Sequence, residues 1–349
     1  MAQIQGLAAH AAGSELLPLK YDPGKLGARE VEIAITHCGI CHSDIHLISN
    51  DWGISQFPFI PGHEIIGTVA AVGSEVRSLE LGQRVGLGWQ SNSCGECEWC
   101  MRGEENLCAA SEGTCVHRHG GYADRVRANA RFVVPIPDAL PSEQTAPLLG
   151  GGITVYNPLR IYGVNPSSRV GIVGIGGLGH MAIQFARVFG AHVTAFSTTL
   201  AKEEEARALG AHHFVNSRES KAMKEVAGSI DFILTTVNAD QDWGTYVQAL
   251  RPNGSLWFVG VPPSPVTAHA FPLVSGQRTI GGSPIGSPFH LRECSTSPPA
   301  TESKPPPRAF PWTKPTRPST KLKKAKSATA PSSPTNVHGG SPSSVNYEL

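Results

Sequence analysis

The sequence predicts a mixed fold, with a β-rich N-terminal part followed by an α/β part built on a parallel sheet. Short strand-like runs separated by Gly and Pro dominate the chain up to Val134. Beyond them, apolar strand-like runs alternate with helical segments, which favours a doubly wound parallel sheet. A glycine-rich turn from Gly174 to Gly179 joins the first of these strands to the first of these helices.

The length and charge of the chain bear on its number of domains and its possible partners. The chain has 349 residues, a hydrophobic content of 40% and a formal net charge of +1, so two domains of a globular protein are expected. No apolar run approaches the length of a membrane span, and the N-terminus lacks the pattern of a signal peptide. We therefore expect a cytoplasmic chain with neither a nucleic acid nor a membrane as partner.

The glycine turn is the first candidate site. It follows the strand-like run Arg169 to Val173 and opens an apolar helix that closes at Gly190. Free N–H groups at the start of such a helix stabilise a pyrophosphate, and glycines let the backbone approach it. The predicted cofactor contacts are Gly174, Gly176, Gly177, Leu178 and Gly179. Taken alone, the motif is equally consistent with a simple tight turn.

The next strand indicates which dinucleotide binds. His192 to Phe196 reads as the second parallel strand, and an NAD site places Asp or Glu at its end, to bind the ribose 2′-hydroxyl. Here Ser197, Thr198 and Lys202 stand there instead. Hydroxyls and an ammonium group suit a 2′-phosphate, which a carboxylate would repel, so we expect NADP(H).

Four of the eight cysteines form a compact motif. Cys94, Cys97, Cys100 and Cys108 have the spacing of a closed tetrahedral zinc site, and in a cytoplasmic chain such a cluster favours metal over disulfides. An iron–sulfur cluster is the alternative, but nothing nearby suggests electron transfer. We expect a structural zinc, because protein ligands occupy all four positions.

A second, looser constellation lies earlier in the chain. Cys41 and His63, with Glu64 beside them, could bind a catalytic zinc that keeps one position open, and Asp44 could hold the far nitrogen of His63. From the spacing alone, a buried cysteine and a core histidine are the simpler interpretation.

Taken together, these motifs resemble the zinc-dependent alcohol dehydrogenases of the medium-chain dehydrogenase/reductase superfamily, specifically the branch of cinnamyl alcohol dehydrogenases and NADPH-dependent aldehyde reductases. The resemblance runs from about Tyr21 to Glu293. Besides the four-cysteine motif and the glycine turn, it is carried by Cys38 to His46, Pro61 to Glu64, Gly120 to Ala123 and Gly152 to Tyr156.

The resemblance implies roles for individual residues. Cys41 and His63 would bind a catalytic zinc that acts as a Lewis acid, with Glu64 as an alternative ligand, while Ser43 and His46 would pass the substrate proton to solvent. Cofactor contacts would come from His42, Thr154, Thr236, Gly260, Ser283 and Ile285. Trp52 would wall the pocket of an alcohol or aldehyde, although ordinary packing explains it equally well. The family also suggests a homodimer.

The chain departs from the family at one metal ligand. Relatives have Pro-Leu-Leu-Cys where this chain has Pro147 to Gly150, and glycine offers no side chain to a metal. Two protein ligands bind zinc less tightly than three, unless Glu64 replaces the missing thiolate. We therefore expect a weakened catalytic zinc and an intact structural zinc.

The C-terminal part changes in composition. Cys294 to Asn336 contains ten prolines and a single acidic residue, Glu302, which predicts a disordered tail. Back-translated and read one base earlier from Glu293, the tail permits the ending that relatives have; Trp312-Thr313, for instance, must then give the family's Asp. We infer a single-base deletion near codon 293, with Val337 to Leu349 translated past the original stop.

Together with the resemblance, which implies a GroES-like fold for the first domain, these observations predict three parts: a GroES-like zinc catalytic domain over residues 1–150, a Rossmann NADP-binding domain over 151–290 and the tail over 291–349. The expected function is the interconversion of primary alcohols and aldehydes with NADP(H). The alternative is an impaired NADP(H)-binding remnant that keeps only the structural zinc.

Overall fold

The structure is a computed structural model, and it describes residues 3–296. By its internal contacts the chain divides between Leu149 and Gly150 into two compact units, called here the N-terminal unit (3–149) and the C-terminal unit (150–296). The tail predicted over 291–349 begins as helix, since residues 291–296 belong to the last described helix, contrary to the expected disorder there. The rest of the tail, with the frameshift hypothesis that concerns it, lies outside the described residues.

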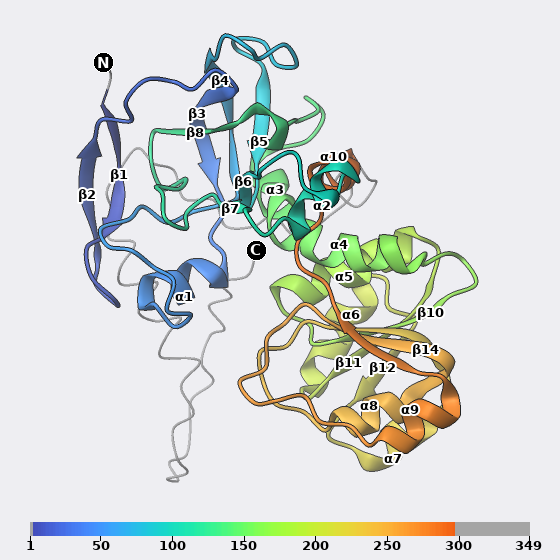
Figure 1. Ribbon diagram of the computed structural model, residues 1–349. Coiled ribbons are helices and arrows are strands. Elements are labelled where there is room, and N and C mark those ends of the chain that lie inside the picture. Colours follow the sequence, from blue (N-terminus) through green and yellow to red (C-terminus); the bar gives the residue numbers. More distant parts are fainter. Residues whose placement is uncertain (1–2, 297–349) are drawn as a thin grey trace. The chain divides into compact units, whose positions relative to one another are not determined.

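The N-terminal unit is built on antiparallel strands (Figure 1). Its main sheet has the order β8-β3-β4-β5-β9, and a separate hairpin, β1-β2, lies beside it. The strands of the sheet are β3 (Glu30–Cys38), β4 (Ile65–Val72), β5 (Arg84–Leu87), β8 (Arg125–Asn129) and β9 (Val133–Pro135). The remaining strands are β1 (Ile4–Ala9), β2 (Leu16–Tyr21), β6 (Gln90–Asn92) and β7 (Glu112–Gly113), and the helices are α1 (His42–Ser49), α2 (Glu98–Met101) and α3 (Ser142–Thr145).

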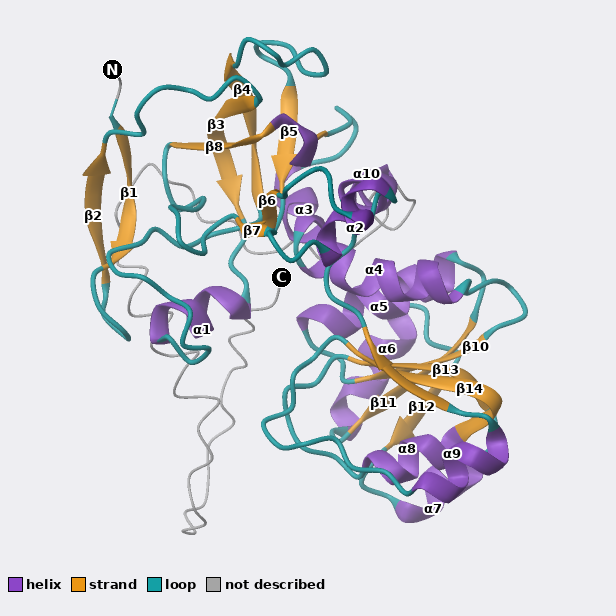
Figure 2. Cartoon of the chain, in the orientation of Figure 1, coloured by secondary structure: helices purple, strands orange, loops and turns teal. Residues whose placement is uncertain are grey.

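The C-terminal unit contains a parallel sheet with the order β12-β11-β10-β13-β14-β15. The strands are β10 (Arg169–Val173), β11 (His192–Ser197), β12 (His213–Asn216), β13 (Ile230–Thr235), β14 (Leu250–Phe258) and β15 (Thr279–Gly282). The helices are α4 (Gly151–Tyr162), α5 (Gly177–Val188), α6 (Glu203–Ala208), α7 (Ser220–Glu225), α8 (Trp243–Ala249), α9 (Ala270–Gly276) and α10 (Pro288–Thr296). Figure 2 shows α4 and α5 on one face of the sheet and α8 and α9 on the other.

Both predicted fold types are confirmed. The order of the parallel sheet reverses between β10 and β13, which is the doubly wound arrangement with its ligand crevice at that reversal. The strands at 65–72 and 169–173 have the predicted limits, and the helix after the glycine turn spans Gly177–Val188. Strand β3 continues to Cys38, beyond the alternating run that ends at Ile35.

The last described helix, α10, crosses the sequence position where the composition changes. It runs to Thr296, and Leu291, Cys294 and Ser295 are buried. Burial raises the pKa of the Cys294 thiol. The ordered fold of the C-terminal unit therefore includes the first residues after Glu293.

Candidate functional site

A buried cluster of metal-ligating side chains lies where β3 ends and α1 begins. One ligand atom from each of Cys41, His63 and Glu64 lies within 4.8 Å of the other two, and His63 and Glu64 are buried. A thiolate, an imidazole and a carboxylate are all ligands that zinc accepts. The donor set therefore fits a zinc ion without Gly150.

The start of α1 fixes two members of this site. Cys41 is the N-cap residue, and its backbone N–H donates to Asp44 Oδ2 at 2.9 Å, so the carboxylate returns to close the first turn. The same carboxylate reaches His63, because Asp44 Oδ1 lies 3.1 Å from His63 Nδ1. The contact predicted between these two side chains is present, and it leaves His63 Nε2 for a metal.

Asp44 is fully buried, and hydrogen bonds from four groups occupy its carboxylate oxygens. It accepts hydrogen bonds from the N–H groups of Cys41 and Gly62, from His63 and from the Tyr122 hydroxyl, at 2.9 to 3.1 Å. A carboxylate has about four lone-pair sites, so Asp44 is suited to orienting His63 and not to binding the metal itself. This distinction separates the cluster of Cys41, His63 and Glu64 from a second geometric grouping of Asp44, His63 and Cys115.

Electrostatics couple Asp44 to His63. Burial lowers the pKa of His63, but the Asp44 carboxylate and then Cys41 raise it, and the net shift is well upward. Burial, the largest effect, raises the pKa of Asp44, but His63, the Cys41 N–H and the Tyr122 hydroxyl together lower it, so the net shift is downward. In the neutral ring, the contact with Asp44 Oδ1 favours a proton on His63 Nδ1, the tautomer in which Nε2 can bind a metal.

Gly39 makes room for Glu64. A Cβ atom built on Gly39 would lie 2.1 Å from Glu64 Oε2, closer than any real contact. The Gly39 N–H also donates to the Glu64 carbonyl at 2.8 Å. The glycine of Cys38 to Cys41 is therefore required for the carboxylate to lie against the turn that carries Cys41.

Two neighbours of His63 were not predicted from the sequence. The ring of Trp89 meets the His63 ring edge to face, with 4.9 Å between centroids, and the buried Cys115 thiol hydrogen-bonds to His63. Trp52 lies 6.3 Å from Trp89 and stacks on His46 at 5.2 Å. Ring contacts therefore connect Trp52 to the metal-ligating cluster through Trp89.

The residues expected to move a proton lie on α1. Ser43 and His46 are half-buried, His42 is exposed, and the rings of His42 and His46 lie 5.1 Å apart. His46 Nδ1 lies 2.9 Å from Asp51 Oδ2 in the turn that follows the helix. Asp51 was missed from the sequence; its carboxylate orients His46 as Asp44 orients His63.

Gly150 begins the C-terminal unit as the N-cap residue of α4. It is buried, and its carbonyl accepts a hydrogen bond from Thr154 Oγ1 at 2.8 Å. Its φ of −117° is open to any residue, so the backbone does not require glycine here. A residue with a side chain could therefore stand at position 150 without a left-handed backbone.

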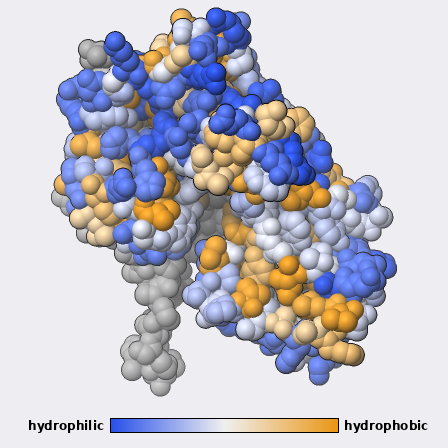
Figure 3. All heavy atoms as spheres, in the orientation of Figure 1, coloured by the Kyte–Doolittle hydropathy of each residue, from blue (hydrophilic) through white to orange (hydrophobic). Residues whose placement is uncertain are grey.

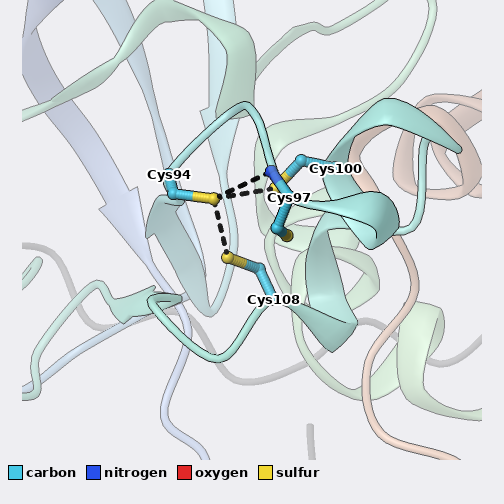
Figure 4. Close-up of side chains that lie close together, drawn as sticks. All are labelled: Cys94, Cys97, Cys100 and Cys108. Atoms are coloured by element: carbon cyan, nitrogen blue, oxygen red, sulfur yellow. Dashed lines mark hydrogen bonds between the residues drawn. The ribbon is translucent and has the colours of Figure 1, made fainter.

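The four-cysteine motif forms a second metal-ligating cluster, shown in Figure 4. Cys94 Sγ lies 3.9 Å from Cys100 Sγ and 3.6 Å from Cys108 Sγ, and all four sulfurs lie within 4.8 Å of one another. Zn–S bonds of about 2.3 Å in a tetrahedron place sulfurs about 3.8 Å apart, so these thiols fit zinc. Backbone N–H groups of Glu96 and Cys97 lower the pKa of Cys94 to about 6.

In the glycine turn of the C-terminal unit, the backbone segments pack too closely for side chains. Gly174 has a φ of +90°, and a Cβ built on Gly179 would lie 1.9 Å from the Gly174 carbonyl oxygen. Gly176 caps α5, whose first two residues are Gly177 and Leu178. The start of α5 therefore packs directly on the turn, with its N–H groups at the carboxyl edge of the sheet.

Ser197 ends β11, and Thr198 follows it; both are half-buried. Ser197 Oγ accepts a hydrogen bond from the Thr199 N–H at 3.1 Å. Lys202 is not free, because its Nζ lies 2.8 Å from a Glu205 carboxylate oxygen. The structure thus brings the predicted hydroxyls to the strand end and adds an acid that competes for the lysine.

The other predicted cofactor contacts lie at the ends of strands of the same unit or on α4. Thr236 follows β13 and donates to the Val173 carbonyl across the reversal of strand order, at 3.0 Å. Gly260 follows β14 and packs closely against Val237. A Cβ atom built on Gly260 would lie only 2.4 Å from the Val237 carbonyl oxygen, so a glycine is needed there. Ser283 and Ile285 follow β15, and Thr154 lies in the first turn of α4.

Comparison with known families supports both units. Residues 27–138 match the alcohol dehydrogenase GroES-like domain, and residues 177–296 match the zinc-binding dehydrogenase domain. No helix among residues 3–296 is long and apolar enough to span a bilayer.

Individual relatives agree with this assignment. The chain is 47% identical to aldehyde reductase AdhA of Synechocystis over 82% of this chain and 85% of the relative, and 42% identical to a probable cinnamyl alcohol dehydrogenase of Oryza sativa over 83% and 84%. It superposes on a cinnamyl alcohol dehydrogenase of Sorghum bicolor with a TM-score of 0.80 and 36% identity, covering 84% and 86% of the two chains. A second structure, of such an enzyme from Helicobacter pylori complexed with NADP(H), gives a TM-score of 0.77 at 33% identity, covering 84% and 87%. The chain therefore belongs to the zinc-dependent alcohol dehydrogenases of the medium-chain dehydrogenase/reductase superfamily, among the cinnamyl alcohol dehydrogenases and aldehyde reductases.

Proposed function

We propose that this chain interconverts primary alcohols and aldehydes by hydride transfer with NADP(H). The observation that carries the proposal is the cluster of Cys41, His63 and Glu64, with His63 oriented by the buried Asp44. The chemistry supplied when cofactor and metal are bound is hydride transfer at the nicotinamide and polarisation of the substrate oxygen by zinc. The solved relative with NADP(H) supports the choice of cofactor.

The side chains of α1 suit the proton transfer that accompanies this reaction. Ser43 stands next to Asp44 in the first turn, and His46 lies one turn later with its Nδ1 held by Asp51 at 2.9 Å. A carboxylate on Nδ1 favours the tautomer of the neutral ring with the proton there, so that Nε2 carries the lone pair. In the proposed reaction Ser43 relays the proton and His46 exchanges it with solvent.

The competing proposal is an impaired NADP(H)-binding remnant with only a structural zinc. It is favoured by one observation, the absence of a donor at Gly150. We expect the catalytic zinc to be weakly held and the structural zinc to be retained, because Glu64 is a harder ligand than the thiolate that relatives have.

Consumption of NADPH and of NADH with a panel of aliphatic and aromatic aldehydes tests the two. We expect aldehyde-dependent oxidation of NADPH, with NADH a poor donor, in protein supplied with zinc. Measurable binding of NADPH without turnover of any aldehyde would favour the remnant.

We also propose a cytoplasmic homodimer. All eight cysteines are free thiols, which suits a reducing compartment. The C-terminal unit exposes apolar side chains on α9, where Phe271 is 79% exposed and Val274 76%, and on the loop before it, where Val261 is 73% exposed. Figure 3 shows apolar residues gathered on the surface of this unit. Such a patch marks an interaction surface. Phe271→Asp should convert a dimer to a monomer in light scattering; a wild-type monomer would contradict the proposal.

A further inference from the structure

A buried amide in α4 joins two parts of the C-terminal unit. Asn157 is 3% exposed, and its side chain is bonded at both ends. Its Nδ2 donates to Ser283 Oγ at 3.0 Å, and its Oδ1 accepts from His290 Nδ1 at 2.8 Å. Since an amide oxygen can only accept, His290 is the donor in the second bond.

The segment that Asn157 holds is the one that follows β15. Ser283 begins it, and at Gly286 the backbone passes so close to α4 that a Cβ would lie 2.6 Å from Ile153 Cδ1 and 3.1 Å from Asn157 Oδ1. Ser283 Oγ in turn donates to the Pro284 carbonyl at 3.0 Å. The short stretch from Ser283 to Gly286 is therefore fixed against one face of α4.

That face of α4 also carries Thr154, because residues three apart in a helix are neighbours. Thr154 on α4 and Ser283 and Ile285 after β15 are predicted cofactor contacts. Strand β15 lies in the half of the doubly wound sheet opposite β11, whose end carries Ser197 and Thr198, the residues predicted for the adenosine 2′-phosphate. Asn157 thus ties together the two chain segments that would border one end of NADPH.

His290 fixes the orientation of the Asn157 side chain. It lies on α10, which is anchored by the burial of Leu291 and Cys294 and by an ion pair between Arg160 and Glu293 at 3.3 Å. The ion pair joins α4 to α10 without touching Asn157. The hydrogen bond from His290 therefore links α10 to Asn157 on α4, and Asn157 in turn donates to Ser283 in the segment after β15.

We propose that Asn157, oriented by His290, is a positioning residue for the nicotinamide end of NADP(H). The inference rests on the proposed cofactor assignment. It predicts that loosening Asn157 weakens binding of the whole dinucleotide while leaving recognition of its adenosine half unchanged.

The test compares two ligands that share the adenosine 2′-phosphate, NADPH and 2′,5′-ADP, by direct titration of the full chain. Asn157→Leu keeps the volume and removes both bonds, and should weaken NADPH about 10-fold, the loss of roughly one to two hydrogen bonds, with 2′,5′-ADP unchanged. His290→Ala should weaken NADPH by a smaller factor. His290→Asn, whose amide Nδ2 can donate from the same place, should restore it.

Arg160→Ala is the matched control, because it breaks the other link between α4 and α10 and should leave both affinities unchanged. Equal weakening of NADPH and 2′,5′-ADP by Asn157→Leu would show a merely structural role and overturn the inference. So would wild-type affinity for NADPH in Asn157→Leu. Failure of the wild-type chain to bind either ligand would instead overturn the cofactor assignment on which the inference rests.

Discussion

The buried carboxylate of Asp44 lies 3.1 Å from His63 Nδ1 and spans the two sequence motifs that form the metal-ligating cluster. The same carboxylate caps α1 and receives the Tyr122 hydroxyl, so one side chain sets the position of Cys41 and the tautomer of His63. A carboxylate behind a ligating histidine raises the basicity of that ligand.

Asp44→Asn should therefore weaken zinc at the cluster by about 10- to 100-fold, because the orienting partner of His63 is lost. Competition with a chromogenic chelator would measure this. Asp51→Asn is the control, since Asp51 contacts His46 and not His63. Equal zinc affinity in Asp44→Asn and the wild type would show that Asp44 has no part in metal binding.

Gly150→Cys should add the thiolate ligand that the family resemblance leads us to expect at this position. The φ of −117° accepts a side chain, so the backbone should tolerate the change. We expect the zinc retained after mild chelation to rise from about one ion per chain, held by the four-cysteine motif, to about two. Gly150→Ala should retain about one. Two tightly held ions already in the wild type would contradict the weakened site.

Gly179→Ala should abolish binding of NADPH, because the new Cβ would lie 1.9 Å from the Gly174 carbonyl oxygen and displace the start of α5. Gly244→Ala is the matched control: it lies in a helix, and its Cβ would only approach the Asp242 side chain at 3.2 Å. Titration of both variants by quenching of tryptophan fluorescence would measure the difference. Wild-type affinity in Gly179→Ala would remove the glycine turn as the cofactor site.

Substitutions at the end of β11 should change the preference between NADPH and NADH. Ser197→Asp should favour NADH, since a carboxylate there binds a ribose 2′-hydroxyl and repels a 2′-phosphate. Glu205→Gln should strengthen NADPH, because it releases Lys202 from its 2.8 Å ion pair. Affinities of both cofactors for both variants test this. An unchanged ratio of NADPH to NADH affinity in Ser197→Asp would exclude Ser197 from the site.

The sequence predicts this fold well because its strongest signals are local. The strand, glycine turn and helix around Gly174 are predicted by the spacing of apolar residues and by the close backbone packing that only glycine allows. The spacing of the four cysteines predicts their cluster. The contact between Asp44 and His63 was also within reach, because a metal-bound histidine commonly has a carboxylate partner.

The contacts missed from the sequence join residues that no local pattern relates. Trp89 meets His63 through the packing of separate loops, and Cys115 reaches the same ring from a third segment. The ion pair of Lys202 and Glu205 is local, but helical spacing alone does not decide between a bound phosphate and a neighbouring acid. Asn157 and His290 meet only because α4 and α10 pack together.

The most direct test of the proposed function is the rate of aldehyde-dependent NADPH oxidation in zinc-supplied wild-type protein and in Cys41→Ser. Zinc content and thermal unfolding, measured on the same samples, would confirm that the four-cysteine motif and the fold survive the substitution. The account predicts turnover by the wild type and its loss in Cys41→Ser, with binding of NADPH unchanged. Turnover that persists in Cys41→Ser, or its absence from the zinc-supplied wild type, would contradict it.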